Sequence, residues 1–241
     1  MDSAAPLFAG WKKTMVRSCL QGHMGTVVTD GRTPPESALC AVGDFCFLAG
    51  KPDPELARQA DRPILIPRTP DWEPVLRSVF GEKLSPFTRY AMEGPEAFDR
   101  ERLAAYAAAL PEGYALSPIL PQHYPVLMGQ VWSKDLCGNF RDGDDFVRRG
   151  LGVIALQDGI PVAGASSYTI HDGGVEIEID TRPDQRRKGL ALSCGARLIL
   201  DCLDRGLVPS WDAHNLPSVA LAEKLGYRLR APYQAYLLNL N

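Results

Sequence analysis

The segment TRPDQRRKGLAL, residues 181–192, carries residue types that could bind an anion. Gly189 and Ala191 have little or no side chain, so a bound group could come close to the backbone. Three basic residues stand immediately before them: Arg186, Arg187 and Lys188. Where such a loop opens a helix, free backbone N–H groups and the helix dipole favour a phosphate.

Two common phosphate-binding motifs are absent from the chain. There is no G-x-x-x-x-G-K-[ST], which excludes a P-loop, and no G-x-G-x-x-G, so a dinucleotide-binding fold is unsupported. The pattern present is R-x-x-G-x-A, at Arg186, Gly189 and Ala191. Taken alone, these six residues favour a basic loop that simply precedes a helix over a phosphate site.

The stretch before this loop, VEIEIDT at 175–181, alternates apolar and acidic residues and predicts a strand. Its acidic side chains would share one face: Glu176, Glu178 and Asp180. Three carboxylates in a row are costly unless they are solvated or used. An exposed polar face is one explanation. Because we expect helices on both faces of the sheet, we favour an acid-lined cleft.

The elements around these residues predict an α/β fold with a mixed sheet. The expected strands are 39–48, 64–66, 87–92, 151–156, 161–170, 175–181, 207–212, 227–229 and 233–240. The expected helices are 52–59, 71–80, 99–110, 122–136, 142–149, 188–203 and 217–225. Pro-Glu-Gly at 111–113 is the best candidate boundary, giving an N-terminal α/β lobe over 1–112 and a second domain over 113–241.

With these elements in place, the motifs resemble those of a known family. EIEIDTRPDQRRKGLA resembles the acetyl-coenzyme A signature of GNAT acetyltransferases, and PSWDAHNLPSVALAEKLGYR resembles their closing motif. GASSYTI, EIEIDT and PSWDAHN together resemble the branch that includes the zwittermicin A resistance acetyltransferase. The GNAT-like part spans roughly 113–241. The resemblance implies a GNAT acyl-CoA N-acyltransferase fold with a smaller N-terminal lobe.

The resemblance also implies acetyl-CoA as co-substrate. In this family the fourth and fifth strands splay apart and the pantetheine arm lies between them. Backbone groups of the fourth strand would pair with that arm, the loop would hold the pyrophosphate, and an asparagine would lie near the thioester. The residues that match these roles are Ile179, Thr181, Arg186, Arg187, Lys188, Gly189, Leu190, Ala191, Leu192 and Asn215.

The family's chemistry is direct attack of an amine on the thioester, helped by a base. A glutamate on the fourth strand matches that role, and we choose Glu178 over Glu176 because it lies nearer the middle of the strand; His214 is the next candidate. Ala222 stands where many members have a tyrosine acid. Three other tyrosines could substitute, unless the thiolate leaves unaided: Tyr227, Tyr233 and Tyr236.

The resulting hypothesis is an N-acetyltransferase acting on a primary amine of a small molecule. A protein amine is the alternative within the enzyme class, and a non-catalytic acyl-CoA sensor is the alternative outside it. The net charge of −3 argues against nucleic-acid binding. The six cysteines have no metal-site spacing, so buried thiols and no metal are expected. We find no targeting or membrane-spanning segment, which predicts a cytoplasmic protein. A homodimer remains open.

Overall fold

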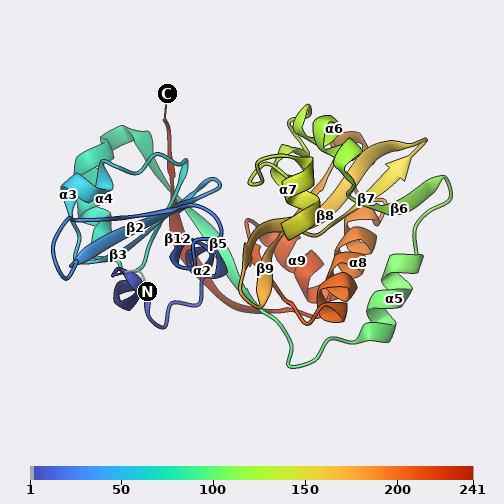
Figure 1. Ribbon diagram of the computed structural model, residues 1–241, viewed down its shortest axis with the longest axis horizontal. Coiled ribbons are helices and arrows are strands. Elements are labelled where there is room, and N and C mark those ends of the chain that lie inside the picture. Colours follow the sequence, from blue (N-terminus) through green and yellow to red (C-terminus); the bar gives the residue numbers. More distant parts are fainter. Residues whose placement is uncertain (1–2, 241) are drawn as a thin grey trace. The chain divides into compact units, whose positions relative to one another are not determined.

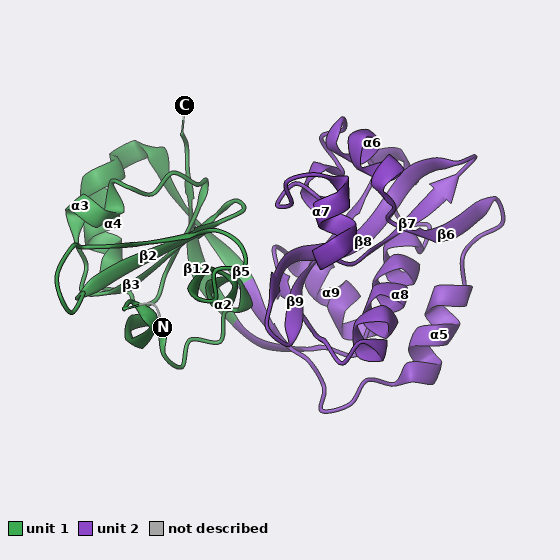
Figure 2. Ribbon diagram, in the orientation of Figure 1, with its two compact units in different colours: residues 1–89, 232–241 green, residues 90–231 purple. Residues whose placement is uncertain are grey.

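The computed structural model describes residues 3–240, which form two compact units (Figures 1 and 2). Unit 1 contains the chain up to Arg89 together with the residues from Pro232 onward. Unit 2 contains Tyr90–Ala231. The boundary predicted at 112 lies inside unit 2, and the last strand returns to unit 1, so the two units are not simply consecutive.

Unit 1 is built on the first six strands of a seven-stranded sheet of order β1-β2-β3-β4-β12-β5-β11, in which β11 is Asp212–Ala213. Its strands are β1 (Thr26–Thr29), β2 (Ser37–Val42), β3 (Phe45–Gly50), β4 (Ile64–Pro67), β12 (Arg228–Leu238) and β5 (Leu84–Glu93). Its helices are α1 (Ala5–Phe8), α2 (Thr14–Leu20), α3 (Pro54–Ala57), α4 (Trp72–Phe80) and the 3₁₀ turn η1 (Gly81–Lys83). Trp72 and Leu76 of α4 are fully buried in its hydrophobic core.

Two strand predictions were wrong. The separate strands predicted at 227–229 and 233–240 are one continuous strand, β12. Residues 39–48 form the hairpin of β2 and β3, not one strand. The chain reverses at Gly43, which has a positive φ of 54°. Glycine adopts this conformation at little cost because it has no side chain. Because both strands are almost completely buried, residues 39–48 are apolar except at the turn itself, Gly43 and Asp44.

Unit 2 is built on a five-stranded sheet of order β10-β9-β8-β7-β6. Its strands are β6 (Tyr114–Pro118), β7 (Gly152–Gln157), β8 (Ile160–His171), β9 (Gly174–Thr181) and β10 (Val208–Ser210). β10 is parallel to β9, and the other neighbours are antiparallel. A short strand, β11 (Asp212–Ala213), pairs instead with Ala91 and Tyr90 of β5. The predicted mixed α/β fold class is therefore confirmed.

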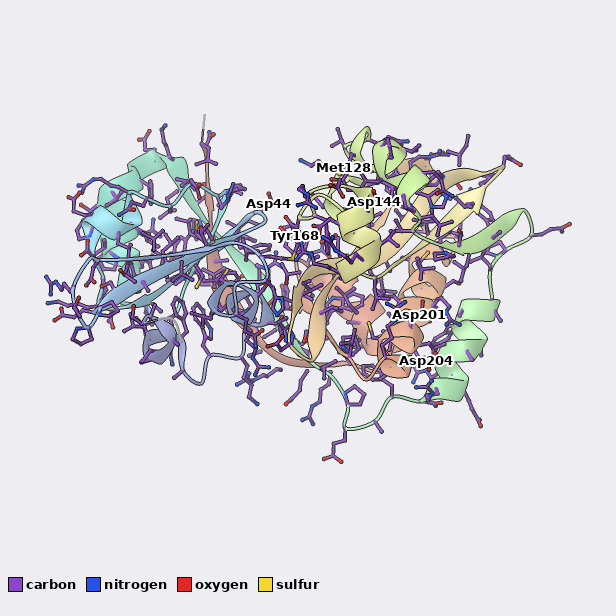
Figure 3. All side chains as sticks on the ribbon, viewed as in Figure 1. Asp44, Met128, Asp144, Tyr168, Asp201 and Asp204 are labelled. Carbon is purple, nitrogen blue, oxygen red and sulfur yellow. The ribbon has the colours of Figure 1, made fainter. Side chains whose placement is uncertain are left out.

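Helices cover this sheet. Helix α8 (Leu190–Asp204) packs on β7, β8 and β9, and α5 (Arg100–Ala108) packs on α8 (Figure 1). Figure 3 labels Asp201 and Asp204 on α8. The other helical segments are η2 (Pro121–His123), α6 (Tyr124–Met128), η3 (Lys134–Leu136), α7 (Gly143–Arg149), η4 (Pro183–Gln185) and α9 (Leu216–Lys224).

A single helix predicted over 122–136 was also wrong, because the region holds only short turns. Helix α6 begins at Tyr124, has Pro125 as its second residue, and ends before Gly129 after five residues. The chain then runs irregularly to η3. Proline and glycine at this spacing leave too few residues for a longer helix. No helix among residues 3–240 is both long enough and apolar enough to cross a membrane.

Candidate functional site

The parallel strands β9 and β10 separate after three residue pairs. Val208, Pro209 and Ser210 face Gly174, Val175 and Glu176, and the pairing ends there. The chain then turns away to form β11, which pairs with β5. In the described part of the chain, β9 from Ile177 onward has only β8 as a strand neighbour. An extended ligand could therefore line up along the open edge of β9.

The acidic residues of β9 share one face of the sheet, as predicted. Glu178 is paired with Ser166 and Asp180 with Gly164, and directly paired residues point to the same face. That face is covered by η3. Ser166 Oγ donates to the Leu136 carbonyl at 2.6 Å, and a Cβ added to Gly164 would lie 2.7 Å from Leu136 Cδ1.

The apolar residues of β9 face α8. A Cβ added to Gly195 of α8 would lie 2.9 Å from Ile179 Cδ1. Glycine at this position therefore lets helix and strand approach closely. With the helix on one face and η3 on the other, the carboxylates lie in a partly dry environment, in which their charges interact more strongly than in water.

Burial differs along the acidic row. Glu176 is only 6% exposed, whereas Glu178 and Asp180 are half-buried. Burial raises the pKa of Asp180, and hydrogen bonding to the Thr181 N–H and the charge of Arg186 oppose that rise. Glu178 therefore combines partial access to solvent with acidic neighbours, a combination that suits a group that exchanges protons.

The loop between β9 and α8 has an unusual backbone. Arg187 has φ of 63°, a left-handed conformation that is uncommon for a residue with a side chain. Gly189 follows with φ of 84° and precedes the first residue of α8. No side chain caps that end of the helix, and a Cβ added to Gly189 would meet no atom within 4 Å. The first-turn N–H groups are thus accessible, which fits a bound phosphate.

Side chains hold this loop in place. Arg182 and Asp184 form a two-bond ion pair with distances of 2.7 and 2.9 Å. Arg186 Nε donates to the Thr181 carbonyl at 3.3 Å, and the Thr181 N–H donates to Asp180 at 2.8 Å. Both backbone groups of Thr181 are therefore bonded within the protein, so any pairing with a ligand would have to share or replace these bonds.

Lys188 is tied to the edge strand β6. Its Nζ donates to Gln185 Oε1 at 2.7 Å and to the Tyr114 hydroxyl at 3.1 Å, while that hydroxyl donates to Gln185 Oε1 at 2.6 Å. Tyr114 was not predicted as a site residue, because no strand was expected over 114–118. The alternation of Tyr114 and Leu116 was the available signal.

Comparison with known proteins gives the family. The sequence profile described as GNAT acetyltransferase matches residues 5–236, nearly the whole chain. The chain belongs to the GNAT acetyltransferase family. The match includes unit 1, so the family extends well beyond the residues 113–241 on which the resemblance was based. It is an enzyme of the N-acetyltransferase class, and GNAT members in general use an acyl-CoA.

Two relatives support this assignment. This GNAT acetyltransferase is 26% identical, over 79% of its length and 71% of the relative's, to an uncharacterized N-acetyltransferase, YdfB, of Bacillus subtilis (strain 168). It is 43% identical to a GCN5-related N-acetyltransferase-like protein from Streptococcus suis 89/1591, whose crystal structure it matches with a TM-score of 0.94. That match covers 98% of this chain and 97% of the other.

A more distant structure has the same fold. The GCN5-related N-acetyltransferase from Kribbella flavida matches with a TM-score of 0.57 at 18% identity, covering 95% of each chain. At this level of identity the similarity concerns the fold alone. The finer assignment to the branch that includes the zwittermicin A resistance acetyltransferase stays a prediction.

Asn215 of this acetyltransferase caps a helix. Its Oδ1 accepts the Ser218 N–H at 2.9 Å and so caps α9. Ser218 Oγ in turn accepts the Trp211 indole N–H at 3.2 Å. The side-chain NH₂ of Asn215 is therefore the group that it could offer a ligand, since its oxygen is already bonded.

The candidate acids of the acetyltransferase lie in different surroundings. Tyr227 is buried and donates to the Pro209 carbonyl at 3.0 Å, and burial raises its pKa well above the usual value. Tyr236 belongs to the core of unit 1, where burial and Glu73 raise its pKa to about 12. Ala222 is completely buried in α9. Burial therefore argues against Tyr227 and Tyr236 as the acid, whereas Tyr233 is partly exposed and stays a candidate beside departure of the thiolate without a dedicated acid.

The cysteines are buried, as predicted, and none forms a disulfide in the described chain. Burial raises the pKa of the Cys194 thiol to about 12, so it stays protonated at neutral pH and is a poor nucleophile. Residues 3–240 contain no group of three or more His, Cys, Asp or Glu side chains arranged to hold a metal ion.

Proposed function

We propose that this GNAT enzyme transfers an acetyl group from acetyl-CoA to a primary amine of a small molecule within a ternary complex. The observation that carries the proposal is the separation of β9 and β10 after Glu176 and Ser210, next to the uncapped N-terminus of α8. One feature offers an open strand edge for the pantetheine arm, and the other offers N–H groups for the pyrophosphate.

The binding residues would be those of β9, the following loop and the start of α9. Ile179 would use its strand backbone, residues 186–192 their N–H groups and positive charge, and Asn215 its side-chain NH₂. Acetyl-CoA supplies the activated acyl group. We place this catalytic part within 113–241, where all of these residues lie.

Glu178 is our choice for the group that receives the amine's proton. An alkyl amine is mostly protonated at neutral pH and cannot attack until that proton leaves. Glu178 is half-buried, next to Ser166 and on the face shared with Asp180. A carboxylate in such a position can take the amine's proton directly or through a water molecule. Glu176, more deeply buried at the point of separation, is the alternative.

The test is an acceptor screen. The purified protein is incubated with acetyl-CoA and a panel of polyamines, aminoglycosides, other amine antibiotics and amine-bearing peptides. Release of free CoA and a product 42 mass units heavier would support the proposal for a small-molecule acceptor. Acetylation of peptides alone would instead favour the protein-amine alternative. Tight binding of acetyl-CoA without acetylation of any amine would favour a sensor.

A further inference from the structure

Strand β8 has one residue more than its partner β9 beside the acidic row. Ser167 pairs with Ile177. Two residues further along β8, Thr169 pairs with Glu176, only one residue along β9, so Tyr168 is the extra residue (Figure 3). Such a β-bulge changes which side chains of a strand face each side of the sheet. It turns Thr169 to the face that carries Glu176, because directly paired residues point to the same face.

A side chain from outside the sheet holds this bulge. Asn139, between η3 and α7, donates through Nδ2 to the Tyr168 carbonyl at 2.9 Å. A bulge interrupts the ladder of backbone hydrogen bonds, so a donor from another segment can satisfy a carbonyl at that point. Asn139 therefore fixes the backbone immediately before Thr169.

The hydroxyl of Thr169 is buried without a hydrogen bond. The residue is completely buried, and its Oγ1 has no hydrogen-bond partner among residues 3–240. Buried hydroxyl groups are usually bonded, because an unsatisfied one destabilises the fold. Ser166, on the same face, is the usual case, since its Oγ donates to the Leu136 carbonyl at 2.6 Å. A polar group kept at a cost in stability points to a partner from outside the protein.

The side chains of β9 that lie nearest to this hydroxyl are carboxylates. Glu176 lies directly opposite Thr169, and Glu178 lies on the diagonal. Diagonal neighbours in a sheet have Cβ atoms roughly 7–8 Å apart, a gap that one nitrogen bonded to both side chains can bridge. Glu178 is half-buried, so a ligand can approach the pair from its side.

We propose that the Thr169 hydroxyl accepts a hydrogen bond from the attacking amine and makes the enzyme selective for primary over secondary amines, with Asn139 as the positioning residue. The proposal rests on the proposed function, in which Glu178 takes the first proton. A primary amine then keeps two N–H groups, one for Glu178 and one for the hydroxyl, while its lone pair points at the thioester carbon. A secondary amine keeps only one N–H and leaves the buried hydroxyl unpaired.

The test measures kcat/KM for the fastest primary amine of the acceptor panel and for its N-methyl derivative. Thr169→Val has nearly the same shape without the hydroxyl. It should lower the native preference for the primary amine by roughly 10-fold and leave the KM for acetyl-CoA unchanged. It should also raise the melting temperature by roughly 2–4 °C, because an unsatisfied buried group is removed. Thr169→Ser keeps the hydroxyl and should keep the preference.

Ser166→Ala is the matched control, because it removes a bonded hydroxyl from the same face of β8. It should lower the melting temperature and keep the preference. Asn139→Leu should also lower the melting temperature, but it should lose the preference as Thr169→Val does. In a Thr169→Val protein, Asn139→Leu should not change the preference further, because both substitutions act on one contact.

An unchanged preference in Thr169→Val overturns the contact with the amine. A lower melting temperature in that variant also overturns it, because the hydroxyl then has a partner within the protein. If Asn139→Leu keeps the preference, Asn139 is not a positioning residue. A native protein that acetylates both amines equally contradicts this contact alone. A native protein that acetylates no amine contradicts the proposed function, and the contact with it.

Discussion

Glu176 and Ser210 are the last residues to face each other across the parallel strands β9 and β10. Beyond them β9 keeps only β8 as a strand neighbour, and the chain after β10 continues into β11, which pairs with β5. The carboxylate row of β9 therefore begins where the sheet opens.

The base assignment predicts the effect of removing one charge. Glu178→Gln keeps size and hydrogen-bonding groups, and should lower kcat by about 10²–10⁴-fold with little change in acetyl-CoA affinity. The pH–rate profile should lose its acidic limb, because that limb reports protonation of the base. Glu176→Gln is the matched comparison. Near-normal kcat in both variants would make the acidic row structural and turn attention to His214.

The phosphate loop predicts a loss of binding at Gly189. The native protein should bind acetyl-CoA with a micromolar dissociation constant, about −7 to −8 kcal/mol. Gly189→Leu should abolish binding, because its side chain would enter the open space before α8. The positive φ should also cost about 1–2 kcal/mol of folding stability.

Gly206 supplies the control for that strain. It lies just beyond the other end of α8, has φ of 67°, and has no atom within 4 Å of an added Cβ. Gly206→Leu should lower the melting temperature about as much as Gly189→Leu while keeping affinity. If folded Gly189→Leu binds acetyl-CoA as tightly as Gly206→Leu and the native protein do in calorimetry, the loop is not the binding site.

Asn215 has two possible roles, capping α9 and contacting the ligand, and substitutions can separate them. Asn215→Asp keeps an oxygen for the Ser218 N–H, so thermal stability should stay close to native. It loses the NH₂ group, and the KM for acetyl-CoA should rise. Asn215→Ala loses the cap as well and should cost about 1 kcal/mol of stability. If Asn215→Asp has native kinetics, the residue serves only the helix.

The ion pairs of Asp145 should make the stability of the protein depend on pH. This buried carboxylate accepts hydrogen bonds from Arg148 and from Arg149, the latter at 2.7 and 2.9 Å. The Arg149 bonds, more than any other contact, hold the pKa of Asp145 far below its ordinary value. A lowered folded-state pKa stabilises the protein above the unfolded pKa of about 4, and this contribution is lost as pH falls.

Asp145→Asn should therefore lower stability at pH 7 by about 2 kcal/mol, the scale of hydrogen bonds to charged groups. The difference from the native protein should shrink as the pH is lowered from 5 toward 2. Asp144→Asn is the control, since Asp144 is an exposed neighbour on α7 (Figure 3). Thermal melts of both proteins across this pH range are the measurement. A stability difference that stays constant with pH would contradict the assigned role of Asp145.

The sequence predicted the region that carries chemistry better than the region before it. The alternation of 175–181 and the glycine at 189 are local patterns, and strand, loop and helix follow them closely. The hairpin at Gly43 was missed because both of its strands are buried, which removes the alternation that marks a strand. The hydrogen bond from Lys188 to the Tyr114 hydroxyl joins residues 74 positions apart, and no local sequence pattern predicts such a contact.

The route of the chain through its two units has a consequence for synthesis. Tyr236 and Leu238 belong to the core of unit 1, yet a ribosome makes them only after all of unit 2. Unit 2 is continuous in sequence and can fold as soon as it emerges. Unit 1 must wait with β4 lacking its partner β12. The nascent protein therefore exposes an unpaired strand edge and an incomplete core, and chaperones have most to protect during that interval.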